Sequence, residues 1–573
     1  MNTLQKSLFL LIFLTLSLFS TPTTETNTSQ ESPISNELKQ FFKKTPSKLL
    51  KGLSQKKFLK RFYKKNNYQT LWMNEKKIDL KKSNELFELI TNDLTLSKKG
   101  MIVKTALRLK KELDHNVTTF EHFRQELKLT SLYNNFLRHT LYGEIQWKQF
   151  SYRLSALKRA KISASWIRNK APEKINTLLL QEDLNKTIEA ITPKKFGYQG
   201  LLHALEVLYT LKENGGWDKL PKFKKIKLGS RGDSVLKLHK RLTQSGDYQT
   251  CEENSTIEVV KKPDLNTTQI TLNIEKDSLF DVCLDKAVKK FQKRHGLVVD
   301  GVVDTGTQKA LNITVDEKIK KVLLNIDRIK WLPRDENERY IVVNIPEFML
   351  HYIEKGESKQ ALRVIVGDRR HHTPIFSEFI SFIVLNPYWK VPEGIVKREI
   401  VPHMIKNPNY LHKQGLEAHT TWNENSPVVD ISMLYWEDYL YEGTTFPYRL
   451  MQPPGPRNAL GKIKFKFPNR FSVYLHDTPT RYLFKKTIRA FSHGCVRLSQ
   501  PKKLLDTIAS FNPSINLKKT KKILKGKRKT QLNLKEKLRI YLVYLTAGIN
   551  SDGTLEFRND IYRYDKYQKR TIR

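Results

Sequence analysis

The stretch RYIVVNIPEFMLHYIEKGESKQALRVIVG, residues 339–367, decides the fold of the C-terminal half of the chain. Apolar and polar residues alternate on both sides of a Lys-Gly turn, which is the pattern of a β-hairpin. Two further strand-like runs follow, FISFIVLNPYW at residues 379–389 and RFSVYLHD at residues 470–477. We therefore expect a β-rich domain over residues 339–515.

A long insertion separates the second of these runs from the third. Residues from about 390 to 450 are expected to form loops and helices and include Trp422 and Trp436. Insertions of this size within a compact domain are usually functional, often as lids over a site. We expect a lid here, and a subdomain without a functional role is the alternative.

The N-terminus has the pattern of an export signal. Lys6 precedes an apolar run, residues 8–19, which ends before Ser, Thr and Pro. This run is shorter than the roughly 20 residues that span a bilayer, so a signal peptide over residues 1–20 is favoured over a permanent anchor. Residues 21–45 begin with a stretch rich in Thr, Ser, Glu and Asn and are expected to form a disordered tether.

Helices are predicted for much of residues 46–222. Stretches such as NELFELITNDL (84–94) and LLHALEVLYTLKENGGW (201–217) space apolar residues three and four apart, and Gly215 is placed to end a helix. No catalytic pattern is found here, so this region is expected to be a helical scaffold domain.

A smaller helical unit follows over residues 223–312. Its first helix is predicted within LGSRGDSVLKLHKRLTQSGDY, where Asp233 or Ser234 can act as the cap. After an insertion the pattern resumes as DKAVKKFQKRHGLVVDGVVDTGTQKALN, where Gly296 ends one helix and Thr305 can cap another. This pattern resembles the three-helix type of peptidoglycan-binding domain. A small bundle with a purely structural role is the alternative.

The insertion in this unit, about residues 250–280, is associated with two of the three cysteines. Cys251 and Cys283 are separated by a polar segment, and in an oxidising compartment they can form a disulfide that closes a local loop. Two buried thiols are the alternative. The third cysteine, Cys495, is then left unpaired. Residues 313–338 are expected to connect this unit to the β-rich domain.

The chain is strongly basic, with 102 Lys and Arg against 58 Asp and Glu and a net charge of +44. This excess favours anionic partners such as nucleic acid, phosphorylated envelope polymers or an acidic wall. The alternative is that all proteins of the source organism are rich in lysine. Basic residues are not interleaved with aromatic residues in a recognisable module, so no nucleic acid is expected as a partner. The densest run, LKKTKKILKGKRKTQ at residues 517–531, is expected to be a solvated basic loop or a surface-binding segment, within a C-terminal extension of the β-rich domain at residues 516–573.

Cys495 lies in FSHGCVRLSQ, residues 491–500. Gly494 permits backbone conformations that other residues avoid, and a helix, SQPKKLLDTIASF, is predicted to follow with Ser499 as its cap. A helix N-terminus or a neighbouring imidazole lowers the pKa of a thiol and populates the nucleophilic thiolate. We therefore favour Cys495 as a nucleophile.

Two histidines lie nearby in the sequence. His476 ends the strand-like run VYLHD, a rigid position suited to a general base, whereas His493 lies in the same turn as Cys495. The backbone N–H groups of Gly494 and Cys495 are candidate donors to an oxyanion. In an alternative interpretation the cysteine, both histidines and Asp477 ligate zinc, although the cysteine lacks a short-spaced partner. A purely structural thiol is a further alternative.

A family resemblance connects these features. HDTPTRYLFKKTIRAFSHGCVRL resembles the active-site signature of the L,D-transpeptidase catalytic domain, also called the YkuD domain. The similarity extends through NPYWKVPEGIVKREIVP (386–402), PPGPRNALGKIKF (453–465) and YLVYLTAGINSDGTLEFRNDIYRYD (541–565). With YQTLWMNE and GGWDKLP in the helical region, the chain resembles the large YcbB-like subgroup. The resemblance implies a multidomain α+β protein with a helical scaffold, a small three-helix peptidoglycan-binding domain and a β-rich catalytic domain with a lid.

The resemblance also implies a two-step acyl transfer without metal or cofactor. The Cys495 thiolate attacks the carbonyl of the diaminopimelate at the third position of a tetrapeptide stem, releases the terminal D-Ala and forms a thioester. A diaminopimelate amine from a neighbouring stem then resolves the thioester and produces a cross-link. His476 is expected to move the protons, Asp477 to hold the strand position after it, and His493 to support the turn.

Three further residues are assigned to substrate binding by this resemblance. Arg497 matches the motif and is expected either to hold a donor carboxylate or to brace the loop. Tyr388 and Trp389 border the lid and are expected to be walls of a donor site or else core residues. The lid is expected to exclude water, which competes with the acceptor amine for the thioester.

The expected partners are the stem peptides and glycan of peptidoglycan, in the periplasm or cell envelope. Membrane contact is expected only through the signal segment, if it remains uncleaved. A wall-binding protein with an inactive catalytic domain is the alternative function, although the motif residues are all present. Hydrolysis, exchange of the terminal D-amino acid, or attachment of a protein to the wall would use the same thioester.

Overall fold

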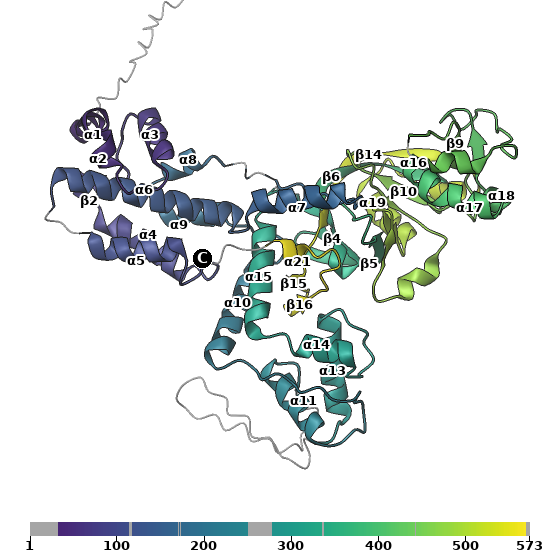
Figure 1. The fold of residues 1–573 in the computed structure, drawn as a ribbon, viewed down its shortest axis with the longest axis horizontal. Helices are drawn as coiled ribbons and strands as arrows, with labels where there is room; N and C mark the ends of the chain where they lie inside the picture. The colour runs from purple at the N-terminus through teal and green to yellow at the C-terminus, as the bar shows by residue number, and fades with distance from the viewer. Residues whose placement is uncertain are drawn as a thin grey trace, which may run out of the picture. The chain divides into compact units, whose positions relative to one another are not determined.

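The computed structural model describes residues 32–113, 117–169, 171, 173–249, 278–334, 337–441 and 443–568 (Figure 1). The expected signal peptide, residues 1–20, lies outside these ranges. The chain divides into two compact units, one made of Met1–Leu80 and Leu113–Ser131, the other of Lys81–Glu112 and Leu132–Arg573. Within the described ranges, no helix is both long enough and apolar enough to cross a membrane.

The first unit is helical around a buried carboxylate. The Tyr63 hydroxyl donates a 2.6 Å hydrogen bond to Glu126, and the backbone N–H of Trp72 donates another of 2.8 Å to the same carboxylate. Trp72 is only 1% exposed. The elements are α1 (Pro33–Lys44), α2 (Pro46–Leu49), α3 (Lys56–Lys65), β1 (Met73–Asn74), β2 (Lys77–Ile78) and the first part of α6 (Thr119–Tyr142).

Part of the predicted tether is instead a helix, because residues 33–44 form α1. The Ser32 hydroxyl caps this helix by accepting a hydrogen bond from the N–H of Ser35. Leu38 is fully buried on the inner face of α1. The polar residues at the start of the predicted tether therefore gave no indication of α1, which buries only one narrow apolar face.

The second unit contains the remaining scaffold helices. Both stretches with helical spacing form helices as predicted, and Gly215 (φ +88°) follows the end of the second. The elements are α4 (Leu80–Asn92), α5 (Met101–Glu112), the rest of α6, α7 (Trp147–Arg159), α8 (Ile175–Leu179), α9 (Leu184–Ile191) and α10 (Tyr198–Glu213).

The small helical unit consists of α11 (Asp233–Gln244), α13 (Val282–Arg294) and α14 (Thr305–Leu311), which share one apolar core. Two predicted caps are displaced by one residue. Gly232 precedes α11, and Asp304 rather than Thr305 caps α14, because the Asp304 carboxylate accepts from the N–H of Thr307.

Of the two cysteines predicted to pair, Cys283 is disulfide-bonded and lies in α13. Cys251 lies outside the described residues, so the pairing of the two remains a prediction.

The predicted connector is a buried helix, α15 (Val315–Ile329), which packs along α10 (Figure 1). Thr314 and Glu317 form a capping box at its start. Val322 and Ile326 are fully buried in the core that α15 shares with α10. The segment is therefore part of the fold rather than a linker.

The β-rich domain is a sheet that closes on itself. The strand order is β12-β5-β13-β11-β10-β6-β14-β3-β4, and β4 pairs again with β5 through the hairpin predicted at the Lys-Gly turn. The strands are β3 (Arg339–Asn344), β4 (Met349–Glu354), β5 (Glu357–Gly367), β6 (Phe376–Leu385), β10 (Ile463–Lys466), β11 (Leu475–His476), β12 (Ala490–Ser492), β13 (Val496–Leu498) and β14 (Thr530–Val543).

The insertion at residues 390–450 is a folded subdomain with its own core, which includes Val401, Trp436 and Leu450. Besides helices it contains a three-stranded sheet in the order β7-β9-β8, which corrects the expectation of loops and helices alone. The elements are β7 (Trp389–Lys390), α16 (Glu393–Ile395), the π-helical turn η2 (Val396–Ile400), α17 (Val401–Lys406), α18 (Tyr410–Gln414), β8 (Glu417–His419), η3 (Trp436–Leu440) and β9 (Arg449–Gln452).

The basic run at residues 517–531 is not a loop, which corrects the prediction. It forms α20 (Leu517–Lys525) and the start of β14. Asn516 caps α20, and Leu524 is buried while most of the lysines face outward. β14 lies between β6 and β3, so the C-terminal extension completes the sheet.

The remaining elements are η4 (Arg481–Lys485), α19 (Pro501–Phe511), β15 (Ala547–Ile549), β16 (Leu555–Phe557) and α21 (Tyr564–Tyr567). α19 follows Gln500 rather than the predicted cap Ser499, because Pro501 occupies its first turn.

Candidate active site

Three neighbouring strands align polar side chains on the face of the sheet opposite the core. β10 pairs Lys464 with His476 of β11, and β11 pairs His476 with Arg497 of β13. Successive side chains of a strand point to opposite faces, and the alternate residues Phe465 and Leu475 are fully buried in the core. The three polar residues therefore form one row across the strands.

Cys495 immediately precedes β13 and lies two residues before Arg497, which belongs to this row. The N–H of Val496 donates a 3.1 Å hydrogen bond to the carbonyl of Tyr474, so the pairing of β11 with β13 continues to this point. Cys495 thus shares a face with His476, in a diagonal position on the adjacent strand. The half-buried thiol is free and donates weakly, at 3.9 Å, to the carbonyl of Ser472. Within the described part of the chain, no hydrogen bond joins it to His476.

The imidazole of His476 is 5% exposed and has a defined tautomer. Its Nδ1 lies 2.6 Å from the backbone carbonyl oxygen of Asp477. A carbonyl oxygen can only accept, so Nδ1 carries the proton and Nε2 is an acceptor. Burial, together with the charges of Arg497 and Lys464, lowers the pKa of His476 to about 3. The imidazole is therefore neutral at neutral pH.

The carboxylate of Asp477 is used by the chain around it. It accepts from the backbone N–H of Lys462 at 2.9 Å and from that of Thr478 at 2.7 Å, and it pairs with Arg481. Gly461 (φ +59°) leaves room for it, since a Cβ there would lie 2.4 Å from the carboxylate. Asp477 contributes its backbone carbonyl to the site, while its side chain braces the turn.

The thiol lies in a basic and aromatic environment. Burial raises the pKa of Cys495 above its ordinary value, whereas hydrogen bonding with Tyr474 and the charges of Lys464 and Lys466 oppose this shift. Burial also lowers the pKa of Lys464 to about 8. The Nζ atoms of Lys464 and Lys466 lie 3.9 and 5.2 Å from the centroid of the Tyr474 ring.

The cysteine loop, residues 491–495, turns at Gly494, whose φ of +107° favours glycine. The N–H of Gly494 donates a 3.2 Å hydrogen bond to the hydroxyl of Ser492. This predicted oxyanion donor is therefore engaged within the loop, and the N–H of Cys495 is the stronger candidate. His493 forms an ion pair with Glu399, on the π-helical turn of the insertion.

The residues predicted to bind substrate have different surroundings. Arg497 donates a 3.3 Å hydrogen bond from Nη1 to the hydroxyl of Thr480, while its buried Nε has no partner among the described residues. Trp389 packs against the core of the insertion, and Tyr388 is half-buried, with a pKa raised by burial. Both alternatives, donor-site wall and core residue, therefore stay open for Tyr388 and for Trp389.

Two of the residues considered as zinc ligands, Asp477 and His493, have other partners in the structure. The Asp477 carboxylate binds backbone N–H groups and His493 binds Glu399. The described residues bring together no group of three or more His, Cys, Asp or Glu side chains that could hold a metal ion.

Sequence reasoning missed the neighbours of the thiol. Tyr474 is two residues before His476, and Lys464 and Lys466 alternate with Ile463 and Phe465, so strand alternation alone could have identified all three.

Three regions of the chain match known families. Residues 338–526 match YkuD, the L,D-transpeptidase catalytic domain. Residues 57–205 match a "Scaffold domain", and residues 231–311 match a "Putative peptidoglycan binding domain". The order of these regions confirms the predicted multidomain α+β architecture.

A curated relative and two solved structures are also similar. A "Putative L,D-transpeptidase" of Haemophilus influenzae is 33% identical over 260 residues, which is 45% of this chain and 50% of that protein. The chain thus matches about half the length of this relative. An L,D-transpeptidase structure from Xylanimonas cellulosilytica is 15% identical with a TM-score of 0.17, and covers 56% of this chain and 99% of its own. Another, from Stackebrandtia nassauensis, is 14% identical with a TM-score of 0.20, and covers 57% and 97%.

Proposed function

We propose that this chain, which carries an L,D-transpeptidase catalytic domain beside a peptidoglycan-binding domain, is a peptidoglycan L,D-transpeptidase with Cys495 as its nucleophile. One observation carries the proposal. The register of β11 and β13 sets Cys495, His476 and Arg497 on one face of the closed sheet. A thiol, an imidazole with an acceptor nitrogen and a guanidinium together suit acyl transfer from a carboxylate-bearing peptide.

In the first step, the Cys495 thiol passes its proton to Nε2 of His476 as Sγ bonds to the carbonyl carbon of the third stem residue. A rotation about χ1 of Cys495 is needed to bring Sγ toward the imidazole, and contacts of this kind often tighten only with substrate bound. The oxyanion that forms accepts from the N–H of Cys495. The bond to the terminal D-Ala then breaks, and His476 returns the proton to the leaving amine. The product is a thioester.

In the second step, the amine of a neighbouring stem attacks the thioester carbonyl. His476 accepts a proton from this amine, the C–S bond breaks, and the thiolate takes the proton back. The products are a new amide, which cross-links two stems, and the free thiol. Atoms and charges balance without a further reactant.

The charge of the site supports a donor with carboxylates. Arg497, Lys464 and Lys466 surround the thiol, and the buried Nε of Arg497 has no hydrogen-bond partner among the residues that the structure describes. A guanidinium can hold a stem carboxylate with two parallel hydrogen bonds. We assign Arg497 to this contact, with Thr480 fixing its orientation.

The insertion at residues 390–450 supports the expected lid. Its π-helical turn contacts the cysteine loop through the ion pair of Glu399 with His493. A subdomain anchored at this point can cover the donor and exclude water from the thioester.

The test is mass spectrometry of protein and products after incubating the purified chain with a disaccharide-tetrapeptide under reducing conditions. We expect release of D-Ala, a thioester adduct on Cys495 and a cross-linked dimer. Cys495→Ala should show none of these, and His476→Gln should slow adduct formation by about 10²- to 10⁴-fold. Adding a free D-amino acid tests for exchange. If the wild type binds the fragment but forms no adduct and releases no D-Ala, the proposal is wrong and a wall-binding role replaces it.

A further inference from the structure

The cysteine loop is held by a second loop, residues 367–375, which we call the bracing loop. The hydroxyl of Thr373 donates a 2.9 Å hydrogen bond to the carbonyl of Gly494 and accepts one of 2.8 Å from the N–H of Gly367. The N–H of Asp368 also donates to the carbonyl of Ser492 at 2.9 Å. Thr373 is 0% exposed, so no water competes for these contacts.

These contacts fix one peptide plane. The carbonyl of Gly494 and the N–H of Cys495 belong to the same trans peptide and point in opposite directions. Because Thr373 holds the carbonyl from one side, the N–H of Cys495 is directed to the other side. The orientation of the candidate oxyanion donor therefore depends on the hydroxyl of Thr373.

The bracing loop is in turn held by the C-terminal segment, residues 544–568. The hydroxyl of Tyr562 accepts a 3.1 Å hydrogen bond from the N–H of Thr373 and donates one of 2.6 Å to the carbonyl of Gly367. The Tyr562 ring stacks on His372, with centroids 3.9 Å apart. Tyr562 is 3% exposed. The hydroxyl of Tyr562 thus connects Gly367 at the start of the bracing loop with Thr373 near its end.

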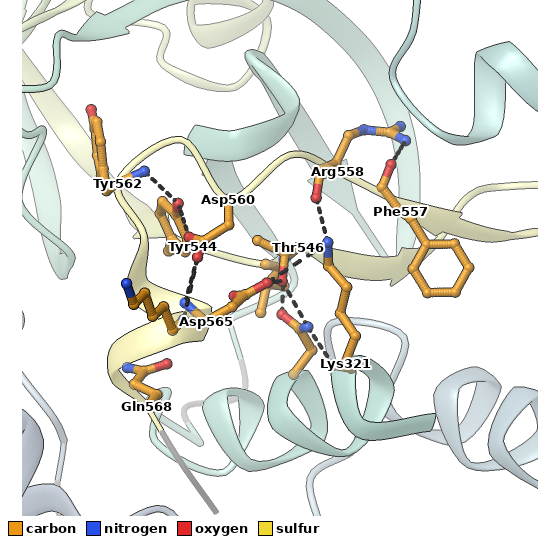
Figure 2. Close-up of polar contacts among 12 residues, drawn as sticks. Lys321, Tyr544, Thr546, Phe557, Arg558, Asp560, Tyr562, Asp565 and Gln568 are labelled. Carbon is orange, nitrogen blue, oxygen red and sulfur yellow. Dashed lines mark hydrogen bonds and ion pairs between the residues drawn. The ribbon is translucent and has the colours of Figure 1, made fainter. Parts of the chain in front are cut away.

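The C-terminal segment is itself anchored on α15 (Figure 2). Asp565 forms an ion pair with Arg328 at 2.7 Å, and Lys321 donates a 2.7 Å hydrogen bond to the carbonyl of Arg558. Figure 2 shows Lys321, on α15, beside Thr546 and Asp565 of the C-terminal segment. The support of the cysteine loop therefore begins outside residues 338–526, the part that matches the catalytic family.

We propose that Thr373 and Tyr562 are positioning residues for Cys495. Through hydrogen bonds in series they hold the Gly494-Cys495 peptide in the orientation that directs the Cys495 N–H at the reacting carbonyl. This inference rests on the proposed function, because the oriented N–H matters only if an oxyanion forms at Cys495. It adds to that function a supporting path from α15 through the C-terminal segment to the nucleophile.

The test compares two variants that break the path with two matched controls. Tyr562→Phe and Thr373→Val remove the hydroxyls that contact the bracing loop and the Gly494 carbonyl. Thr373→Ser keeps its hydroxyl. Tyr352→Phe removes the hydroxyl of another buried tyrosine of the β-rich domain, on β4, where its ring stacks on Phe511 of α19.

The first measurement is the single-turnover rate of Cys495 acylation by the disaccharide-tetrapeptide, at varied concentration. We expect Tyr562→Phe and Thr373→Val to lower the maximal rate by about 10- to 100-fold with the half-saturating concentration changed less than about twofold, because a misdirected oxyanion donor weakens the transition state. Thr373→Ser and Tyr352→Phe should stay within about threefold of the wild type. An unchanged rate in both breaking variants, or an equal loss in Tyr352→Phe, would overturn the proposal.

The second measurement is independent of acyl transfer. Amide hydrogen exchange of peptides covering residues 490–498 should be faster in Tyr562→Phe and Thr373→Val but unchanged in the two controls. If the wild type forms no acyl-enzyme, the proposed function fails, and this exchange still decides the positioning role. Equal protection of the cysteine loop in all five proteins would contradict that role.

Discussion

At the residue level, burial determines the protonation of both members of the candidate catalytic pair. It raises the pKa of the Cys495 thiol and lowers that of His476 to about 3. A thiol that holds its proton beside an imidazole that does not take one is a neutral resting pair. The proton is therefore expected to move only when a donor is bound and its carbonyl begins to carry negative charge. Such a site protects its thiol from non-specific reaction between turnovers.

Replacing Lys464 by Met should slow the alkylation of Cys495 by iodoacetamide about three- to tenfold at pH 7, which corresponds to about half to one unit of thiol pKa. With a pKa of about 8, Lys464 is mostly charged at pH 7 and favours the thiolate. By pH 9.5 it is mostly neutral, so the wild type and the variant should converge there. The measurement is the alkylation rate of Cys495 from pH 6 to pH 10.

Lys502→Met, which changes an exposed lysine on α19, is the control and should follow the wild type. A slowing by Lys464→Met that is constant over the whole pH range would mean that Lys464 acts through packing rather than charge.

Local sequence suggests part of the candidate site but not the rest. Cys495 and His476 are predicted as the candidate pair because a cysteine in a glycine turn and a histidine that ends a strand are local patterns. Thr373 and Tyr562 carry no such pattern. They reach Gly494 and Thr373 across 121 and 189 residues of sequence, so only the packed fold reveals them.

At the level of elements, α15 carries a buried lysine, Lys318, that forms no ion pair with a carboxylate in the described part of the chain. Lys318 is 3% exposed, and its Nζ lies 3.2 Å from Nε2 of His295 and 4.8 and 5.0 Å from the ring centroids of Phe557 and Trp217. Burial lowers its pKa well below the ordinary value. Folding at neutral pH therefore either buries a charge or removes a proton, and both cost free energy.

Lys318→Gln, which keeps an N–H donor for His295 but removes the charge, should stabilise the chain by about 1 to 2 kcal/mol at pH 7. The lysine has a lowered pKa in the folded state, so the unfolded chain binds more protons and wild-type stability should rise with pH toward 10.5. The advantage of the variant should shrink over the same range. The measurement is the urea midpoint from pH 6 to pH 10, and a pH-independent difference would contradict this account.

Elements with strong periodicity were predicted correctly, and those whose apolar face is narrow were not. α4, α10 and the hairpin of β4 and β5 have regular spacing. α20 was mistaken for a loop because its lysines outnumber the residues that it buries, of which Leu524 is one. Its helical state depends on packing against the β-rich domain, which composition does not report.

At the level of the whole molecule, the net charge of +44 should make binding to peptidoglycan depend on salt. Stem peptides carry carboxylates, and attraction between exposed charges weakens as the Debye length falls from about 10 Å at 0.1 M to about 3 Å at 1 M. We expect the bound fraction on isolated sacculi to fall several-fold between 0.05 and 0.5 M NaCl. Insoluble chitin, a glycan without carboxylates, is the control and should bind weakly at all salt concentrations. Salt-independent binding to sacculi would show that the charge has no part in it.

The place of β14 in the sheet has a consequence for biogenesis. Residues 530–543 are made after every other strand of this sheet, yet they lie between β6 and β3, where Arg539 pairs with Tyr340. Pairings so distant in sequence form slowly, because a long loop must close first. The sheet cannot close before this strand is added, so a nascent chain, or one cut before residue 530, is expected to lack an assembled active site. The order of synthesis thereby delays reactivity until residues 530–543 have been made.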